Sequence, residues 1–210
     1  MTMLAYLNDP TLKARFLAEL ALHREEDRII RGTYGEVADG GWKGCAVGCS
    51  LRSLNRLAGK DGGAMEENTG VHARYPAELG IPLQLAYLED RIFEGLPMDD
   101  SKEWPERFSR AIHVGADLSL VWPRFIVWLL GNTKQHANKR GKKVIDAVIA
   151  LYERRIAGDE PTSDEWNDAR FNVAANAAAD AAAASYAAAR QQHYKRQSDA
   201  LVRLLEECVP

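Results

Sequence analysis

The sequence has no apolar run long enough to span a bilayer and no marked excess of charge of one sign. Its longest strongly apolar run covers residues 125–130, whereas a transmembrane helix needs about 20 apolar residues. The formal net charge is −3 and the pI is about 6.0, while nucleic-acid-binding domains usually carry a basic excess. We therefore expect neither a membrane protein nor a nucleic-acid-binding protein.

One local basic cluster departs from this balance. It could contact phosphate groups, but a solvated loop that leads into a helix is the preferred interpretation. The cluster consists of Lys134, Lys139, Arg140, Lys142 and Lys143.

Cysteine is scarce, and the common catalytic motifs are missing. Three cysteines are an odd number for a disulfide framework, and residues 1–9 lack the basic and apolar regions of a signal peptide. We therefore expect a cytoplasmic protein with reduced thiols. Phosphate-loop, dinucleotide-binding and nucleophile-elbow motifs are also absent.

The composition is that of a globular protein, with 46% apolar and 27% charged residues. Glycine and proline punctuate segments with helical periodicity, and no stretch alternates β-branched residues. The sequence therefore predicts an all-α protein, a single compact domain of about seven to nine helices, with a helical core over residues 1–160 and a glycine-rich loop at 32–44. The expected core helices cover residues 10–31, 45–57, 82–94, 104–112, 123–130 and 139–157.

Residues 161–210 form an alanine-rich helical segment, which we expect to pack on the core. Twelve of the sixteen residues 174–189 are alanine, the best helix former. An unbroken helix here would overhang a compact domain, so we expect a break between Arg190 and Ser198. Small side chains permit close helix packing. The alternative is a flat surface for a protein partner, or for a second copy in a homodimer.

The segment Gly41-Trp42-Lys43-Gly44-Cys45-Ala46-Val47-Gly48-Cys49 is the strongest candidate for chemistry. It places Cys45 at the expected start of a helix, where free amides and the helix dipole favour a thiolate. Cys49 follows one turn later. Cysteines are also common as small core residues, and that reading stays open.

A histidine and an aspartate lie within the apolar stripe of the first expected helix. His23 and Asp27 are one turn apart, so the carboxylate could accept the imidazole N–H and fix its tautomer. Together with Cys45 as nucleophile they would supply a base and an orienting group for acyl transfer. His72 is a competing base. The structural alternative is a His–Asp pair that satisfies its own hydrogen bonds.

Zinc is the one metal for which the sequence offers a candidate site, and no other cofactor is expected. Cys45, Cys49, His23 and His72 would form a Cys₂His₂ set. The Cys-x₃-Cys spacing is less diagnostic than a paired Cys-x₂-Cys array. In a separate segment, Asp90 lies on a helix that is apolar almost all round, where we expect it to accept a buried hydrogen bond or to pair with Arg91 or Arg124.

Three phrases in this chain together resemble those of one protein family. They are Gly44-Cys45-Ala46-Val47-Gly48-Cys49, then Leu79-Gly80-Ile81-Pro82 with Leu88-Glu89-Asp90-Arg91-Ile92-Phe93-Glu94-Gly95-Leu96-Pro97, and Gly115-Ala116-Asp117-Leu118-Ser119. Over roughly residues 10–205 the chain resembles an uncharacterised family of bacterial and phage proteins with alanine-rich C-terminal helices. The family has no established activity, so the resemblance assigns no functional residue.

Because no complete catalytic motif is visible, the sequence favours an intracellular regulatory or inhibitory protein that binds a macromolecular partner. The resemblance to bacterial and phage proteins allows for a phage origin. A cysteine-dependent enzyme that uses Cys45, His23 and Asp27 is the first alternative. A zinc-stabilised helical domain is the second.

Overall fold

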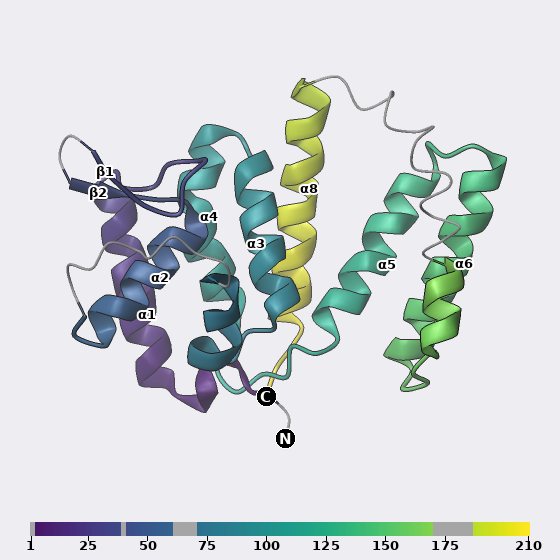
Figure 1. The fold of residues 1–210 in the computed structure, drawn as a ribbon, viewed down its shortest axis with the longest axis horizontal. Helices are drawn as coiled ribbons and strands as arrows, with labels where there is room; N and C mark the ends of the chain where they lie inside the picture. Colours follow the sequence, from purple (N-terminus) through teal and green to yellow (C-terminus); the bar gives the residue numbers. More distant parts are fainter. Residues whose placement is uncertain (1–2, 39–40, 61–70, 170–186) are drawn as a thin grey trace. The chain divides into compact units, whose positions relative to one another are not determined.

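The structure, a computed structural model, describes residues 3–38, 41–60, 71–169 and 187–210. The fold is all-α, as predicted, and the described residues include one two-stranded sheet (Figure 1). Among these residues, no helix is both long and apolar enough to cross a membrane. The elements are η1 (Ala5–Asn8), α1 (Pro10–Glu25), β1 (Glu36–Ala38), β2 (Gly41–Lys43), α2 (Ala46–Leu57), η2 (Val71–Ala73), η3 (Tyr75–Leu79), α3 (Leu83–Gly95), α4 (Met98–Ala111), α5 (Val121–Lys134), α6 (Lys139–Ile156), a helical segment at 163–169, and α8 (Ala187–Glu206).

Contacts group the chain into two compact units. One contains Met1–Ser119 and Tyr194–Pro210, and the other contains Leu120–His193. The expected division into a core over 1–160 and a packed segment over 161–210 stays a prediction. Most of the alanine-rich stretch, residues 170–186, lies outside the described residues, and so does the homodimer surface expected there.

The core of the first unit forms where α1, α2, α3 and α4 pack against one another (Figure 1). Phe16 of α1, Phe93 of α3 and Phe108 of α4 are all fully buried. Trp104 packs on Phe108 with ring centroids 5.8 Å apart, and its indole N–H donates to the backbone oxygen of Glu89 at 3.0 Å. Burial of large apolar side chains stabilises each helix by removing their surface from water.

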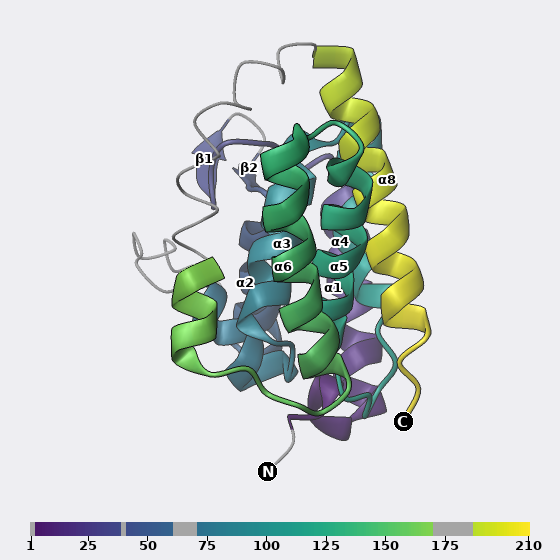
Figure 2. The same ribbon diagram turned by 90° about the vertical axis from the view of Figure 1, so that its right-hand side faces the viewer.

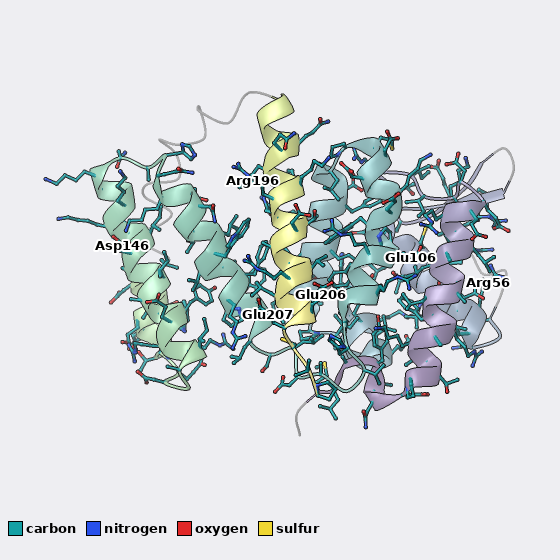
Figure 3. All side chains as sticks on the ribbon, turned by 180° about the vertical axis from the view of Figure 1, so that it is seen from behind. Arg56, Glu106, Asp146, Arg196, Glu206 and Glu207 are labelled. Atoms are coloured by element: carbon teal, nitrogen blue, oxygen red, sulfur yellow. The ribbon has the colours of Figure 1, made fainter. Side chains whose placement is uncertain are left out.

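Ion pairs fasten α1 to its two neighbours. Arg56 of α2 lies 3.1 Å from Glu19 of α1, and Glu106 of α4 lies 3.2 Å from Arg24 of α1; Figure 3 labels Arg56 and Glu106. The Glu106 side chain is only 12% exposed, so this pair is better shielded from solvent than a surface ion pair.

α1 ends earlier than the apolar periodicity predicts. It stops at Glu25, and Asp27 takes a left-handed backbone conformation with φ = 50°. Ile29 then forms a bridge with Gly44, and the Ile30 N–H donates to the Gly44 oxygen at 2.9 Å. The position of Ile30 in the sequence fits the apolar face of the predicted helix. In the structure, however, its backbone N–H is bonded to Gly44, on the far side of the glycine-rich loop.

Three other helix boundaries also differ from the prediction. α4 begins at Met98 rather than near Trp104. α5 continues through Gly131 to Lys134, although glycine was expected to end it. α8 runs without interruption from Ala187 to Glu206, so the predicted break between Arg190 and Ser198 is wrong. Packing against the rest of the fold decides these boundaries more strongly than local propensity does.

The glycine-rich loop contains a short hairpin that the sequence did not predict. β1 and β2 pair antiparallel, with Val37 opposite Trp42 and Glu36 opposite Lys43. Trp42 is 8% exposed and lies against α1 and α2, with its ring 4.9 Å from the Arg52 guanidinium. The hairpin therefore positions one large aromatic side chain over the beginning of α2.

The second half of α8 packs on α3 and α4 of the first unit. A side chain at Gly95 would begin 2.2 Å from the ring of Tyr194, so glycine is required for this contact. Arg107 of α4 donates to Asp199 at 2.8 Å, and Lys195 lies 2.9 Å from Asp100.

In the second unit, α5 and α6 lie side by side (Figures 1 and 2). Asn138 caps α6 by accepting from the Gly141 N–H at 2.8 Å. Tyr152 of α6 meets Trp166 in the following helical segment, with ring centroids 4.8 Å apart. α6 was predicted almost to the residue because a cap and a glycine flank it.

Candidate functional site

Cys45 and Cys49 lie in a buried turn at the start of α2, as the sequence predicts. Cys45 is the N-cap, and its Sγ accepts from the Gly48 N–H at 3.5 Å. The Cys49 thiol donates to the Gly44 oxygen at 3.5 Å. The two residues are 2% and 0% exposed. We call Cys45–Cys49 the thiol turn.

Burial keeps both sulfurs protonated. It raises the pKa of Cys45 to about 12, although the Gly48 and Val47 amides oppose the shift. It also raises the pKa of Cys49 well above its usual value. The helix start supplies the donors that favour a thiolate, but desolvation outweighs them. The thiol turn is therefore not a poised nucleophile in this conformation.

The preceding loop is what covers the thiol turn. A Cβ at Gly48 would lie 1.7 Å from the backbone oxygen of Tyr34, and one at Gly44 would lie 2.7 Å from it. The Cys45 N–H also donates to the Thr33 oxygen at 2.8 Å. Both glycines are thus needed so that the loop backbone can contact the helix directly.

His23 is buried, but it lacks the carboxylate partner that the sequence predicted. It is 1% exposed and packs against Trp42, with ring centroids 5.4 Å apart. Within the described part of the chain, neither ring nitrogen has a hydrogen-bond partner. Burial, reinforced by nearby arginines, lowers its pKa to about 4.

Asp27 lies outside the helix and points to solvent. Its side chain is 67% exposed and accepts a hydrogen bond from Lys102 at 2.5 Å, which holds the pKa of the carboxyl below its usual value. The predicted His23–Asp27 hydrogen bond is wrong because α1 ends before Asp27. His23 and Asp27 therefore do not form a base-and-orienter pair with Cys45.

The histidine–carboxylate pair that does form involves His72, the competing base. Its Nε2 lies 3.1 Å from Oδ2 of Asp90, and the two side chains are 6% and 22% exposed. The His72 ring packs on Tyr87 with centroids 4.2 Å apart, and the ring of Tyr34 is nearly perpendicular to the His72 ring, with centroids 5.9 Å apart. Asp90 thus accepts a partly buried hydrogen bond, which is one of the two roles that the sequence predicted for it, from a partner that the sequence did not identify.

Two tyrosines and one further carboxylate lie around this pair at the surface. Tyr34 and Tyr87 are 40% and 53% exposed. Glu94, one turn beyond Asp90 on α3, accepts from the Gly32 N–H at 3.1 Å. Burial raises the pKa of the Tyr34 hydroxyl, and Asp90 and Glu94 add to the rise. We call Tyr34, His72, Tyr87, Asp90 and Glu94 the tyrosine–carboxylate surface.

A third carboxyl group, next to Asp90 in the sequence, lies in the core. Glu89 is fully buried, and its Oε2 accepts from the Tyr75 hydroxyl at 2.6 Å. Its Oε1 has no hydrogen-bond partner among the described residues. Burial raises its pKa to about 8. Glu89 lies on the helix that the sequence predicts to be apolar almost all round, whereas its contact with Tyr75 depends on the tertiary fold.

The residues predicted to hold zinc are engaged separately. Cys45 and Cys49 bond to local backbone groups, His72 bonds to Asp90, and His23 packs on Trp42. Across the described ranges, no group of three or more histidine, cysteine or acidic side chains could hold a metal ion. The predicted Cys₂His₂ set is therefore not brought together.

A separate pocket of about 540 Å³ lies between α4 and α8. Three arginines and two carboxylates line it, and Arg107 is already paired with Asp199 at 2.8 Å. Glu206, labelled in Figure 3, lies on its α8 side. Because opposite charges neutralise one another there, the pocket is less specific than the tyrosine–carboxylate surface. Its lining residues are Arg107, Arg110, Ala111, His113, Asp199, Val202, Arg203 and Glu206.

Known proteins give no further guide to the site. No protein-family model, curated protein or solved structure matches the chain, so the resemblance to the family of bacterial and phage proteins stays a prediction.

Proposed function

We propose that this chain is a cytoplasmic regulatory or inhibitory protein that acts by binding a protein partner through the tyrosine–carboxylate surface. The exposure of Tyr34 and Tyr87, which both contact the ring of one buried histidine, carries the proposal. Tyrosine combines a large rigid contact area with a polar hydroxyl, and it is enriched among the residues that dominate binding energy at protein interfaces.

The two tyrosines are held in place rather than loosely exposed. Both contact the ring of His72, which Asp90 orients through its carboxylate. The Tyr34 backbone is also pressed against the first turn of α2. An anchor that is fixed before binding loses little conformational freedom when the partner arrives, which favours affinity.

The arrangement of the thiol turn gives less support to the cysteine-dependent enzyme. A nucleophile needs access to substrate and an activating base, whereas Cys45 is 2% exposed and its Sγ accepts from a backbone amide. Reduced thiols fit a cytoplasmic protein. All three cysteines lie within the described residues, and none forms a disulfide.

The test compares capture of a partner by three forms of the chain in the cells that naturally produce it. Each form is tagged, crosslinked and purified, and its fold is checked by circular dichroism. We expect the wild type and a Leu22→Ala control, which changes an exposed residue of α1, to recover the same defined protein. The Tyr34→Ala/Tyr87→Ala double variant should lose it. Equal recovery by the double variant would reject this surface, and recovery of nothing above background by the wild type would reject the function.

A further inference from the structure

We propose that the tyrosine–carboxylate surface binds an arginine side chain of the partner, held against Tyr34 and Tyr87 and bonded to Asp90 and Glu94. This inference rests on the proposed function and names the group that the surface recognises. The argument begins with the hydrogen bonds that the two carboxylates already make.

Each carboxylate uses one oxygen within the chain and leaves the other available. Asp90 engages His72 through Oδ2, and Glu94 engages the Gly32 N–H through Oε1. In the described part of the chain, Oδ1 of Asp90 and Oε2 of Glu94 make no hydrogen bond, and neither is a buried atom without a partner. The protein therefore orients both carboxylates while keeping one acceptor on each for a ligand.

The local field favours a cation. Besides burial, the negative charges of Asp90 and Glu94 raise the pKa of the Tyr34 hydroxyl, so the two carboxylates create a negative potential at this ring. Asp90 and Glu94 also raise the pKa of the buried Cys45 thiol. A cation placed between Asp90 and Glu94 would reduce the repulsion between their negative charges, whereas an anion would increase it.

The aromatic rings favour arginine over lysine. A guanidinium is planar, stacks on aromatic faces and presents five donors that can reach two carboxylates at once. An ammonium is more strongly hydrated and does not stack in this way.

Two arginines of the chain lie near this surface and could affect its affinity for an arginine ligand. Arg31 donates to the backbone oxygen of Leu96 and is thereby occupied. Arg91 is exposed on α3, one turn after Tyr87, and forms no ion pair among the described residues. Its positive charge should repel an incoming guanidinium, so Arg91→Ala should tighten binding.

The direct test is an NMR titration of the full-length chain with a short capped peptide that contains one arginine. We expect the ring resonances of Tyr34 and Tyr87 to shift, with a Kd on the order of 1–10 mM. The same peptide with the uncharged isostere citrulline should bind at least about tenfold more weakly. Tyr87→Ala and Glu94→Gln should each weaken binding, Arg91→Ala should strengthen it, and Leu22→Ala should have no effect.

Absence of arginine binding, or equal binding of the citrulline peptide, would overturn the inference. If a partner is nevertheless captured in a tyrosine-dependent way, the proposed function stands and only the arginine assignment fails. If arginine binds selectively but no partner is captured from cells, the inference stands and the proposed function fails.

Discussion

Glu89 is a carboxyl group that the fold keeps protonated. It lies on α3 with no solvent exposure, accepts one hydrogen bond from Tyr75 and leaves Oε1 without a partner in the described residues. A buried polar atom without a partner costs about 1–3 kcal/mol. Because burial disfavours the charged form, the pKa of Glu89 rises to about 8.

The protonated Glu89 makes stability depend on pH. Between its unfolded pKa of 4.5 and its folded pKa of about 8, the unfolded chain has lost a proton that the folded chain retains. Its contribution to stability is therefore fully present below pH 4.5 and is lost as the pH rises toward 8. We expect Glu89→Gln to remove this slope and to gain about 3 kcal/mol relative to the wild type between pH 5 and pH 8.

Urea unfolding of both proteins at pH 5, 6, 7 and 8 measures this difference. Glu103→Gln, which changes an exposed residue of α4, is the matched control and should follow the wild type. A constant difference between Glu89→Gln and the wild type across this range would mean that Glu89 is ionised in the folded protein.

His23 has the opposite dependence. Its folded pKa is about 4, against 6.5 for the ordinary side chain, so the unfolded state binds a proton first as the pH falls. The stability associated with neutral His23 is therefore present above pH 6.5 and is lost as the pH falls toward 4. By pH 5 the loss should be about 2 kcal/mol.

His23→Phe should remove this acid-induced loss, because phenylalanine can occupy the site against Trp42 without a titratable nitrogen. The free energy of unfolding at pH 7 and pH 5 provides the measurement. His113→Gln changes an exposed histidine and should retain the loss. If His23→Phe lost as much stability at pH 5 as the wild type, burial of a neutral imidazole would not be the cause.

The candidate site shows how far single residues can be identified from the sequence. The thiols, His72 and Asp90 were all identifiable from residue type and neighbours. The pairing of His72 with Asp90 was not, because the two residues are 18 positions apart and are brought together by the packing of η2 against α3. The sequence instead favoured His23 with Asp27, a local pair that depended on the helix continuing.

The backbone of the glycine-rich loop packs directly against α2 and shields the thiol turn from solvent. A Cβ at Gly48 would meet the Tyr34 carbonyl at 1.7 Å, a separation that backbone atoms cannot tolerate. Gly48→Ala should therefore displace the loop and destabilise the first unit by about 2 kcal/mol or more, despite the better helix propensity of alanine. It should also accelerate the reaction of Cys45 with iodoacetamide.

Gly131→Ala in α5 is the matched control. A Cβ there would meet no atom within 4 Å, so the substitution should stabilise the second unit by about 0.5–1 kcal/mol. It should leave Cys45 labelling unchanged. If Gly48→Ala were as stable as the wild type and Cys45 reacted no faster, the loop would not be what protects the thiol.

Elements with clear end signals were predictable from the sequence, and those defined by distant contacts were not. α2, α3 and α6 match the predicted ranges closely because caps, prolines and glycines mark their ends. The hairpin was missed because its three-residue strands are too short to show alternation. α8 continues through Arg190–Ser198, where length alone had suggested a break.

For the molecule as a whole, the order in which the cysteines react distinguishes a binding protein from a thiol enzyme. Cys208 is partly exposed near the end of the chain, whereas Cys45 and Cys49 are buried. Iodoacetamide at neutral pH, followed by mass spectrometry, should modify Cys208 first. Cys45 and Cys49 should react more than about tenfold more slowly and rapidly only after unfolding. Fast labelling of Cys45 that is lost in His72→Ala would instead favour the enzyme.

The most direct measurement of the central claim is tyrosine nitration of the chain, alone and in its complex with the captured partner. Tyr34 and Tyr87 are half-exposed and should be modified in the isolated protein. In the complex both should be protected, while Tyr152 of α6 should be modified to the same extent in the two states. Unchanged modification of Tyr34 and Tyr87 in the complex would contradict the claim that this surface is the one the protein uses.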